Sequence, residues 1–213
     1  MVIASRVRRV AIQLKVLVRV GSSNPTQLLG KEHEICCSGI DVSCLSETSH
    51  TKKAECIIRS RCKSKLFSCA FGSPVPDLFD KRGGSLRGFA QGVATISRFP
   101  VFDGSHVLDL DHSLVHRIQI VVVQLMHVPV RIINLYLKPG SCEFSSRLNG
   151  RLTQLAASAA CSTHGPCMIT GDLNHPISDL GPLNELLSVG WKDAALHCAL
   201  VDGVEAPPTC MQA

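Results

Sequence analysis

Aromatic residues are scarce in this sequence: they make up 4% of the chain, with one tyrosine and one tryptophan. Stacking surfaces for the bases of single-stranded nucleic acid are therefore few, so any contact with nucleic acid is expected to run from arginine and lysine to the backbone. The sequence also lacks a run of about 20 apolar residues, which a membrane-spanning helix needs. We therefore expect no membrane partner.

Three common catalytic or nucleotide-binding motifs are missing as well. The sequence holds no Gly-x-Ser-x-Gly elbow, no Gly-x-x-x-x-Gly-Lys-Ser/Thr phosphate loop and no Gly-x-Gly-x-x-Gly fingerprint. The glycine-rich segment 83–88 has the wrong spacing for any of them. These absences speak against a serine hydrolase, a P-loop nucleotidase and a dinucleotide-binding fold.

The composition is typical of one folded domain: of 213 residues, 45% are hydrophobic and 18% are charged. The net charge of +5 favours a polyanionic partner such as nucleic acid. Several of the 11 cysteines lie in apolar runs, where a free thiol behaves as a small hydrophobic group. Reduced thiols predict an intracellular, reducing compartment, without distinguishing nucleus from cytoplasm. The oligomeric state stays open.

Alternating short strands and helices predict an α/β (α+β) fold, with an N-terminal tail at 1–9 and one domain at 10–213. Period-two alternation predicts a first strand at 10–20, and Pro25 suits the first turn of a helix running to about Cys37. The segment 72–88 is expected to be a loop, and 126–129 a hairpin turn. Further strands are expected at 41–46, 92–98, 117–125, 130–137 and from 168, and further helices at 52–62, 145–160 and 180–189.

The most informative segment is Gly171-Asp172-Leu173-Asn174, which follows a short apolar run. A strand there would deliver one carboxylate and one carboxamide side by side onto a loop. A carboxylate accepts a proton from water, and a carboxamide donates a hydrogen bond to a phosphoryl oxygen. The pair predicts a site that cleaves phosphate esters.

Other polar residues also stand at or just beyond the ends of expected strands. Ligand sites of open sheets collect at such edges, so these side chains are expected to converge on one cleft. The set is Asn24, Glu47, Tyr136, Asp172 and Asn174.

Six segments, taken in order, resemble the endonuclease/exonuclease/phosphatase superfamily, which has the deoxyribonuclease I-like fold. The resemblance covers about residues 10–213 and is closest to the abasic-site and retrotransposon-type endonuclease domains. The segments are Lys15 to Asn24, Gly39-Ile40-Asp41-Val42-Ser43-Cys44-Leu45-Ser46-Glu47-Thr48, Gly92-Val93-Ala94-Thr95-Ile96-Ser97-Arg98-Phe99-Pro100, Arg131-Ile132-Ile133-Asn134-Leu135-Tyr136-Leu137-Lys138-Pro139-Gly140, Gly171-Asp172-Leu173-Asn174 and Gly190-Trp191-Lys192-Asp193-Ala194.

The resemblance implies a four-layer sandwich of two mixed sheets with outer helices, and hydrolysis of phosphodiesters with Mg²⁺ or Mn²⁺. Nucleic acid would be the substrate, with DNA favoured over RNA, while abasic DNA and a small phosphodiester stay open as well. Glu47 would bind the metal and Asn24 would support it, since Mg²⁺ prefers carboxylate oxygen. Asp172 would activate the water, while Asn174 and Tyr136 would donate hydrogen bonds to phosphoryl oxygens.

Each residue also has a plainer interpretation. Asn24 before Pro25 is an ordinary helix N-cap, Tyr136 a half-buried strand tyrosine, and Asp172 with Asn174 a turn. Glu47 is alternatively a solvated acid at a strand end.

The family's pattern ends with an Asp-containing strand and a Ser-Asp-His triplet. The printed chain reaches Ala213 shortly after Pro207-Pro208-Thr209-Cys210, which resembles the segment leading into them. The resemblance therefore implies a C-terminally truncated domain whose last strands are missing, and leaves its enzyme activity open. Two alternatives remain: an inactive remnant or nucleic-acid-binding module of the same fold, and a phosphatase acting on lipid or inositol phosphates.

Overall fold

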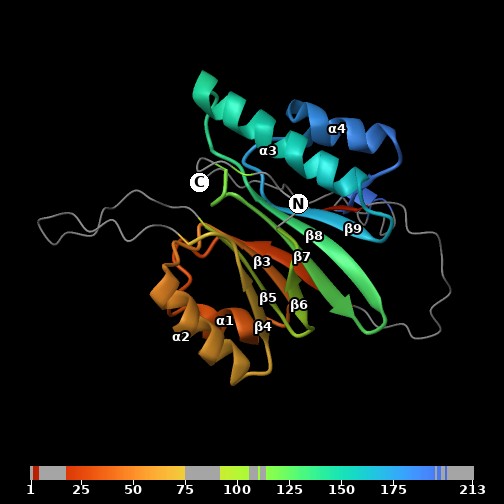
Figure 1. Ribbon diagram of the computed structural model, residues 1–213. Coiled ribbons are helices and arrows are strands. Elements are labelled where there is room, and N and C mark those ends of the chain that lie inside the picture. The colour runs from red at the N-terminus through yellow and green to blue at the C-terminus, as the bar shows by residue number, and fades with distance from the viewer. Residues whose placement is uncertain are drawn as a thin grey trace, which may run out of the picture.

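The computed structural model describes residues 2–4, 18–74, 92–105, 110, 114–194, 196–197 and 200. Their strands form two sheets that lie face to face (Figure 1). The parts of the expected first strand at 10–17 and the expected loop at 75–88, and the segment 207–210, lie outside the described residues.

The larger sheet has six strands in the order β10-β1-β9-β8-β7-β6. Strands β8 and β9 are parallel, and every other neighbouring pair is antiparallel. The bounds are β1 (Val2–Ala4), β6 (Val101–Asp103), β7 (Ile118–Leu125), β8 (Val128–Tyr136), β9 (Cys167–Asp172) and β10 (Lys192–Asp193).

The smaller sheet has four strands in the order β2-β3-β5-β4, with only β2 and β3 parallel. All five residues of β3 and of β5 are buried, as expected for strands covered on both faces. The bounds are β2 (Val20–Ser23), β3 (Val42–Ser46), β4 (Ser68–Phe71) and β5 (Val93–Ser97).

Helices cover the outer face of each sheet (Figure 1). Helices α3 (Glu143–Cys161) and α4 (Gly181–Ser188) pack on the larger sheet, with a short 3₁₀ helix η2 (Ile177–Asp179) before α4. Helices α1 (Glu32–Cys37) and α2 (Lys52–Lys63) pack on the smaller one. None of the described helices is long and apolar enough to cross a membrane.

Three apolar clusters fill the spaces between these layers. One joins the larger sheet to α3 and α4, for example through Leu135 and Leu152. A second joins the smaller sheet to α2 through Leu45 and Ile58, and a third lies between the sheets. The layers run helix, sheet, sheet, helix, which confirms the predicted α/β sandwich of two mixed sheets.

The sequence located most elements correctly, but the expected helix at 25–37 is wrong at its start. It begins only at Glu32, because 25–31 form turns: Gly30 has a φ of +95° and the backbone N–H of Leu28 donates to the Thr48 carbonyl at 2.9 Å. The expected turn at 126–129 is shorter, since β8 already begins at Val128. Short strands β4 and β6 were not predicted, and residues 2–4 of the expected tail form β1.

A row of polar side chains ties the sheets together behind their common edge. Asn134 Nδ2 donates to the carbonyls of Leu45 and Ala94, each at 3.1 Å, although they belong to the opposite sheet. Thr95 Oγ1 likewise donates across the gap to Gln119 Oε1 at 3.0 Å. These bonds fix how the end of β8 lies against the end of β3, where the candidate site begins.

Gly171 brings β9 unusually close to β8 one residue before the acidic loop. It has a φ of +136°, and a Cβ there would meet the Leu135 carbonyl oxygen at 1.9 Å. We expect Gly171→Ala to lower the free energy of unfolding by about 3 kcal/mol or more, from backbone clash plus strain. Urea denaturation measures this change.

Gly150 offers the matched control. It lies in α3 with nothing within 4 Å of its added Cβ, so Gly150→Ala is expected to stabilise the protein by about 0.5–1 kcal/mol. Equal effects of the two substitutions would contradict the close approach at Gly171.

Candidate functional site

Two neighbouring strands of the larger sheet place Tyr136 and Asp172 side by side. They are the last paired residues of parallel β8 and β9, so both side chains lie on the same face of the sheet, and their hydrogen bonds show that this face is turned to the smaller sheet. Glu47 follows β3 directly and Asn24 follows β2, at the facing edge of that smaller sheet. Hydrogen bonds then join the two sheets at this edge, and they bring together four of the five predicted residues.

The first of these bonds joins Tyr136 to Glu47. The Tyr136 hydroxyl donates to Glu47 Oε1, over a separation of 89 residues in the sequence. Tyr136 is 3% exposed, and burial followed by the hydrogen bond and charge of Glu47 raises the pKa of Tyr136 well above its ordinary value. The phenol therefore keeps its proton near neutral pH and acts as a donor.

The second bond joins Asn24 to Asp172. Asn24 Nδ2 donates to Asp172 Oδ2 at 3.2 Å, and Asn24 Oδ1 accepts from the Thr26 backbone N–H at 3.1 Å. Asn24 therefore shapes its own turn and orients the Asp172 carboxylate at once.

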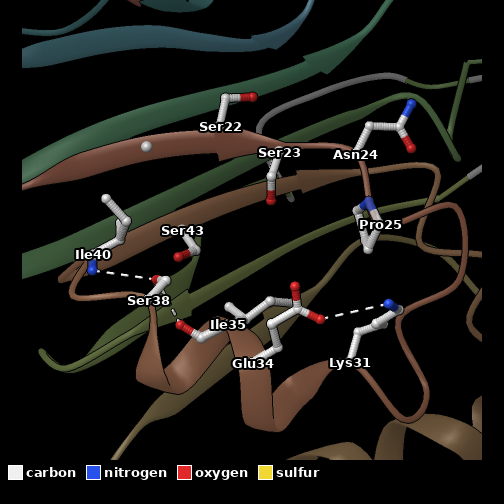
Figure 2. Close-up of a pocket in the computed structure, with 11 residues that line it drawn as sticks. Ser22, Ser23, Asn24, Pro25, Lys31, Glu34, Ile35, Ser38, Ile40 and Ser43 are labelled. Carbon is white, nitrogen blue, oxygen red and sulfur yellow. Dashed lines mark hydrogen bonds and ion pairs between the residues drawn. The ribbon is translucent and has the colours of Figure 1, made fainter.

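A hollow of about 420 Å³ lies on the other side of β2, between that strand and α1. Figure 2 shows Ser23 directed toward this hollow, whereas Ser22 and Asn24 point to the opposite side of the strand. The alternation of a strand thus directs the Asn24 side chain away from this hollow, although Asn24 is among the residues that line it. Asn24 belongs to the edge where the two sheets meet.

Asn174 is held by the neighbouring loop. Its Nδ2 donates to the Leu137 carbonyl at 2.8 Å, and its φ of +53° is one that asparagine tolerates. Asn149 of α3 secures the same loop through both the N–H and the carbonyl of Lys138, at 2.8 and 2.9 Å, and contacts His175 Nε2 at 3.1 Å. No motif in the sequence indicates this support by Asn149.

The backbone at Glu47 is strained. Its φ is +54°, which is unfavourable for a residue other than glycine, asparagine or aspartate. The flanking residues are buried: Ser46 Oγ donates to the Leu135 carbonyl at 3.5 Å, and the Thr48 N–H donates to the Gly92 carbonyl at 3.2 Å. Such over-determined strain is concentrated at functional sites.

Arg117 is a further residue of the edge that sequence reasoning missed. It precedes β7 opposite Tyr136, whose backbone N–H donates to the Arg117 carbonyl at 2.8 Å. The guanidinium carbon lies 4.8 Å from the centre of the Tyr136 ring. The only signal in the sequence was a charged residue at the start of an apolar strand, which is ordinary.

Comparison with known proteins gives no match to a family of sequences or to a curated protein. Solved structures do match. The 3′ phosphatase NExo from Neisseria, solved with a product DNA hairpin, is 16% identical, and the match covers 85% of this chain and 74% of that one with a TM-score of 0.60. An AP endonuclease from Archaeoglobus fulgidus is 14% identical over 89% of this chain and 84% of that one, with a TM-score of 0.55.

A truncated Caenorhabditis elegans TDP2 is 14% identical, with a TM-score of 0.50 over 76% of this chain and 64% of that one. The chain has the endonuclease/exonuclease/phosphatase fold. The family resemblance seen in the six sequence segments is therefore confirmed at the level of the fold.

Within the endonuclease/exonuclease/phosphatase fold of this chain, the donor set at the edge suits a hard divalent cation. Glu47 and Asp172 are half-buried carboxylates at the sheet edge, and one oxygen of Glu47 is already oriented by Tyr136. The described residues hold no group of three or more His, Cys, Asp or Glu that could bind a metal. One or two carboxylates fit Mg²⁺, which keeps several waters, and not a structural zinc.

A buried histidine stands behind the Glu47 loop. His50 is 1% exposed, with Nδ1 2.6 Å from Thr48 Oγ1 and Nε2 3.3 Å from the Gly72 carbonyl. Burial lowers the pKa of His50, and the charges of His116 and Lys52 act in the same direction. The Gly72 bond and Glu55, 3.8 Å from Nε2, oppose them. The ring is therefore neutral at pH 7.

This pKa makes the fold sensitive to acid. The unfolded chain takes up a proton on this histidine at pH values near 6.5, whereas the folded chain resists it, so His50 destabilises the fold progressively as the pH falls below about 6.5. We expect the fall in melting temperature between pH 7 and pH 5 to be smaller in His50→Gln. His164, which is exposed, gives the control His164→Gln, expected to retain the full fall. Identical pH profiles for all three proteins would contradict this assignment.

Proposed function

We propose that this chain hydrolyses phosphodiester bonds of nucleic acid with the help of a divalent cation. The observation that carries the proposal is the edge where parallel strands β8 and β9 set Tyr136 and Asp172 beside one another. Each is bonded to a residue that directly follows a strand of the opposite sheet. Proton acceptor, proton donor and cation ligand thus meet across one gap.

Asp172 is the general base in this proposal. Asn24 orients it through Oδ2, and Oδ1 carries no hydrogen bond to any residue that the structure describes. That oxygen accepts the proton of a water whose oxygen bonds to phosphorus, while the bond from phosphorus to the ester oxygen breaks. The departing oxygen takes a proton from solvent.

The other residues stabilise charge on the phosphoryl group. The Asn174 amide supplies one hydrogen-bond donor, and the Tyr136 hydroxyl supplies another by turning its proton from Glu47 Oε1 to a phosphoryl oxygen. Such donors bind most strongly where negative charge builds up. Glu47, with support from Asn24, would hold Mg²⁺ or Mn²⁺. The cation supplies positive charge beside the phosphate oxygens.

DNA is the substrate we propose, in preference to RNA. The support is the net charge of +5, together with the DNA present in the NExo structure and in one of zebrafish TDP2 with a single-strand product. The nine cysteines of the described residues are free thiols, which supports action in a reducing compartment.

Supercoiled plasmid tests the proposal. The purified, folded chain is incubated with plasmid in Mg²⁺ or in EDTA, and nicked circles are counted on a gel. Nicking in Mg²⁺ that EDTA abolishes is the expected result. Plasmid that is bound but never nicked would instead identify a nucleic-acid-binding module.

A further inference from the structure

Arg117 places a buried positive charge against Tyr136, and the proposed chemistry assigns it no part. Arg117 as a whole residue is 7% exposed. Three contacts join it to Tyr136: the backbone bond at 2.8 Å, a bond from Arg117 Nη1 to the Tyr136 carbonyl at 3.4 Å, and the guanidinium 4.8 Å from the ring centre. Backbone and ring of one residue are thus held by one neighbour.

A purely structural role explains this arginine poorly. Burying a guanidinium is unfavourable unless charges or hydrogen bonds compensate, and an apolar side chain of similar volume often serves stability as well or better. No ion pair joins Arg117 to an acid among the described residues, and burial lowers its pKa although Tyr136 and Glu47 oppose this. The planar guanidinium suits a different task, because it stacks flat on an aromatic face while donating to a carbonyl.

The direction in which the Tyr136 side chain points decides what its hydroxyl reaches. That hydroxyl donates to Glu47 Oε1, so a ring turned away would leave the Glu47 carboxylate without its orienting donor. We infer that Arg117 is a positioning residue, which fixes the Tyr136 ring and through it the Glu47 carboxylate. The kinetic consequence rests on the proposed function, whereas the contact between Tyr136 and Glu47 does not.

A double-mutant cycle tests the kinetic consequence. Arg117→Met is expected to lower kcat for plasmid nicking by roughly 10-fold to 100-fold, the scale of small misplacements, with KM changed by less than about twofold because Arg117 is buried. Since Arg117 acts through the phenol, adding the substitution to Tyr136→Phe should change kcat by less than about twofold. If Arg117→Met lowered kcat equally in the wild-type protein and in Tyr136→Phe, the inference would be overturned.

Arg131 provides a matched control. Its Nη1 donates to the Ala159 carbonyl at 3.0 Å on the other face of the larger sheet, so Arg131→Met also removes an arginine that bonds a backbone carbonyl. Arg131→Met should leave kcat within about twofold of the wild-type value. Arg117→Lys keeps the charge but loses the planar guanidinium, and is expected to lower kcat as well. It replaces Arg117→Met throughout if that variant fails to fold.

A spectroscopic test works without any activity. Tyr136 is the only tyrosine, so its Cζ gives one resonance in a sample labelled with ¹³C-tyrosine. Glu47→Gln should shift this resonance in the wild-type and Arg131→Met proteins. It should not shift it in Arg117→Met, where the Tyr136 hydroxyl no longer bonds to residue 47. An equal shift in all three backgrounds would refute the positioning role. If wild-type protein never nicks plasmid, the proposed function fails and this resonance alone decides about Arg117.

Discussion

Replacing Asp172 by asparagine is expected to lower the rate of metal-dependent strand cleavage by about 1000-fold, within the range seen for loss of a general base. The new carboxamide has the shape of the carboxylate, and its oxygen still accepts from Asn24 Nδ2, which lies 3.2 Å from Asp172 Oδ2. What disappears is the acceptor for the proton of the attacking water. Single-turnover cleavage of an end-labelled duplex measures the loss.

The control for this substitution is Asp179→Asn. Asp179 is an exposed aspartate in the 3₁₀ helix that follows the same loop, so its substitution removes the same charge nearby. It should cleave at the wild-type rate within about twofold. Cleavage by Asp172→Asn within tenfold of wild type, with an unchanged melting temperature, would remove Asp172 from the proposed role.

Glu47→Gln is expected to weaken binding of Mn²⁺ by roughly 100-fold, because truncating one member of a close charge pair commonly costs 2–5 kcal/mol. Cleavage should fall by at least the same factor at limiting cation. The amide oxygen can still accept from the Tyr136 hydroxyl, so the fold is preserved. Enhancement of water proton relaxation by Mn²⁺ measures the affinity directly.

Glu143→Gln is the comparison. Glu143 lies at the start of α3 with its side chain 78% exposed, paired with Arg147. Its loss should leave the affinity for Mn²⁺ unchanged. Unaltered binding in Glu47→Gln would show that the cation, if one binds, is held elsewhere.

The parts of the site that lie on single strands could be predicted from the sequence. Asp172 and Tyr136 each end an apolar strand, and period-two alternation places such residues at an edge. The bonds that join them to the other sheet could not be predicted. Asn24 and Asp172 are separated by 148 residues in the sequence, and whether two such distant residues meet depends on how the sheets pack.

Two wrong or missing sequence predictions have the same cause, which is that a tertiary contact decides the local structure. A helix beginning near Pro25 agrees with local signals, but the Leu28 N–H is used by the Thr48 carbonyl, so a tertiary bond holds the chain in turns. Arg117 was missed because its partner is set by the register of β7 and β8, where Ile118 pairs with Leu135 and so brings Arg117 opposite Tyr136. No spacing within the sequence encodes that register.

Cleavage in water enriched in ¹⁸O tests the central claim most directly. A DNA duplex is cut in Mg²⁺ by the wild-type chain, and the terminal phosphate of the product is analysed by mass spectrometry. Hydrolysis with water activated at Asp172 predicts one ¹⁸O atom in each new phosphate, and labelled product that forms about 1000-fold more slowly with Asp172→Asn. Folded protein that binds the duplex in Mg²⁺ yet yields no labelled phosphate would contradict the account.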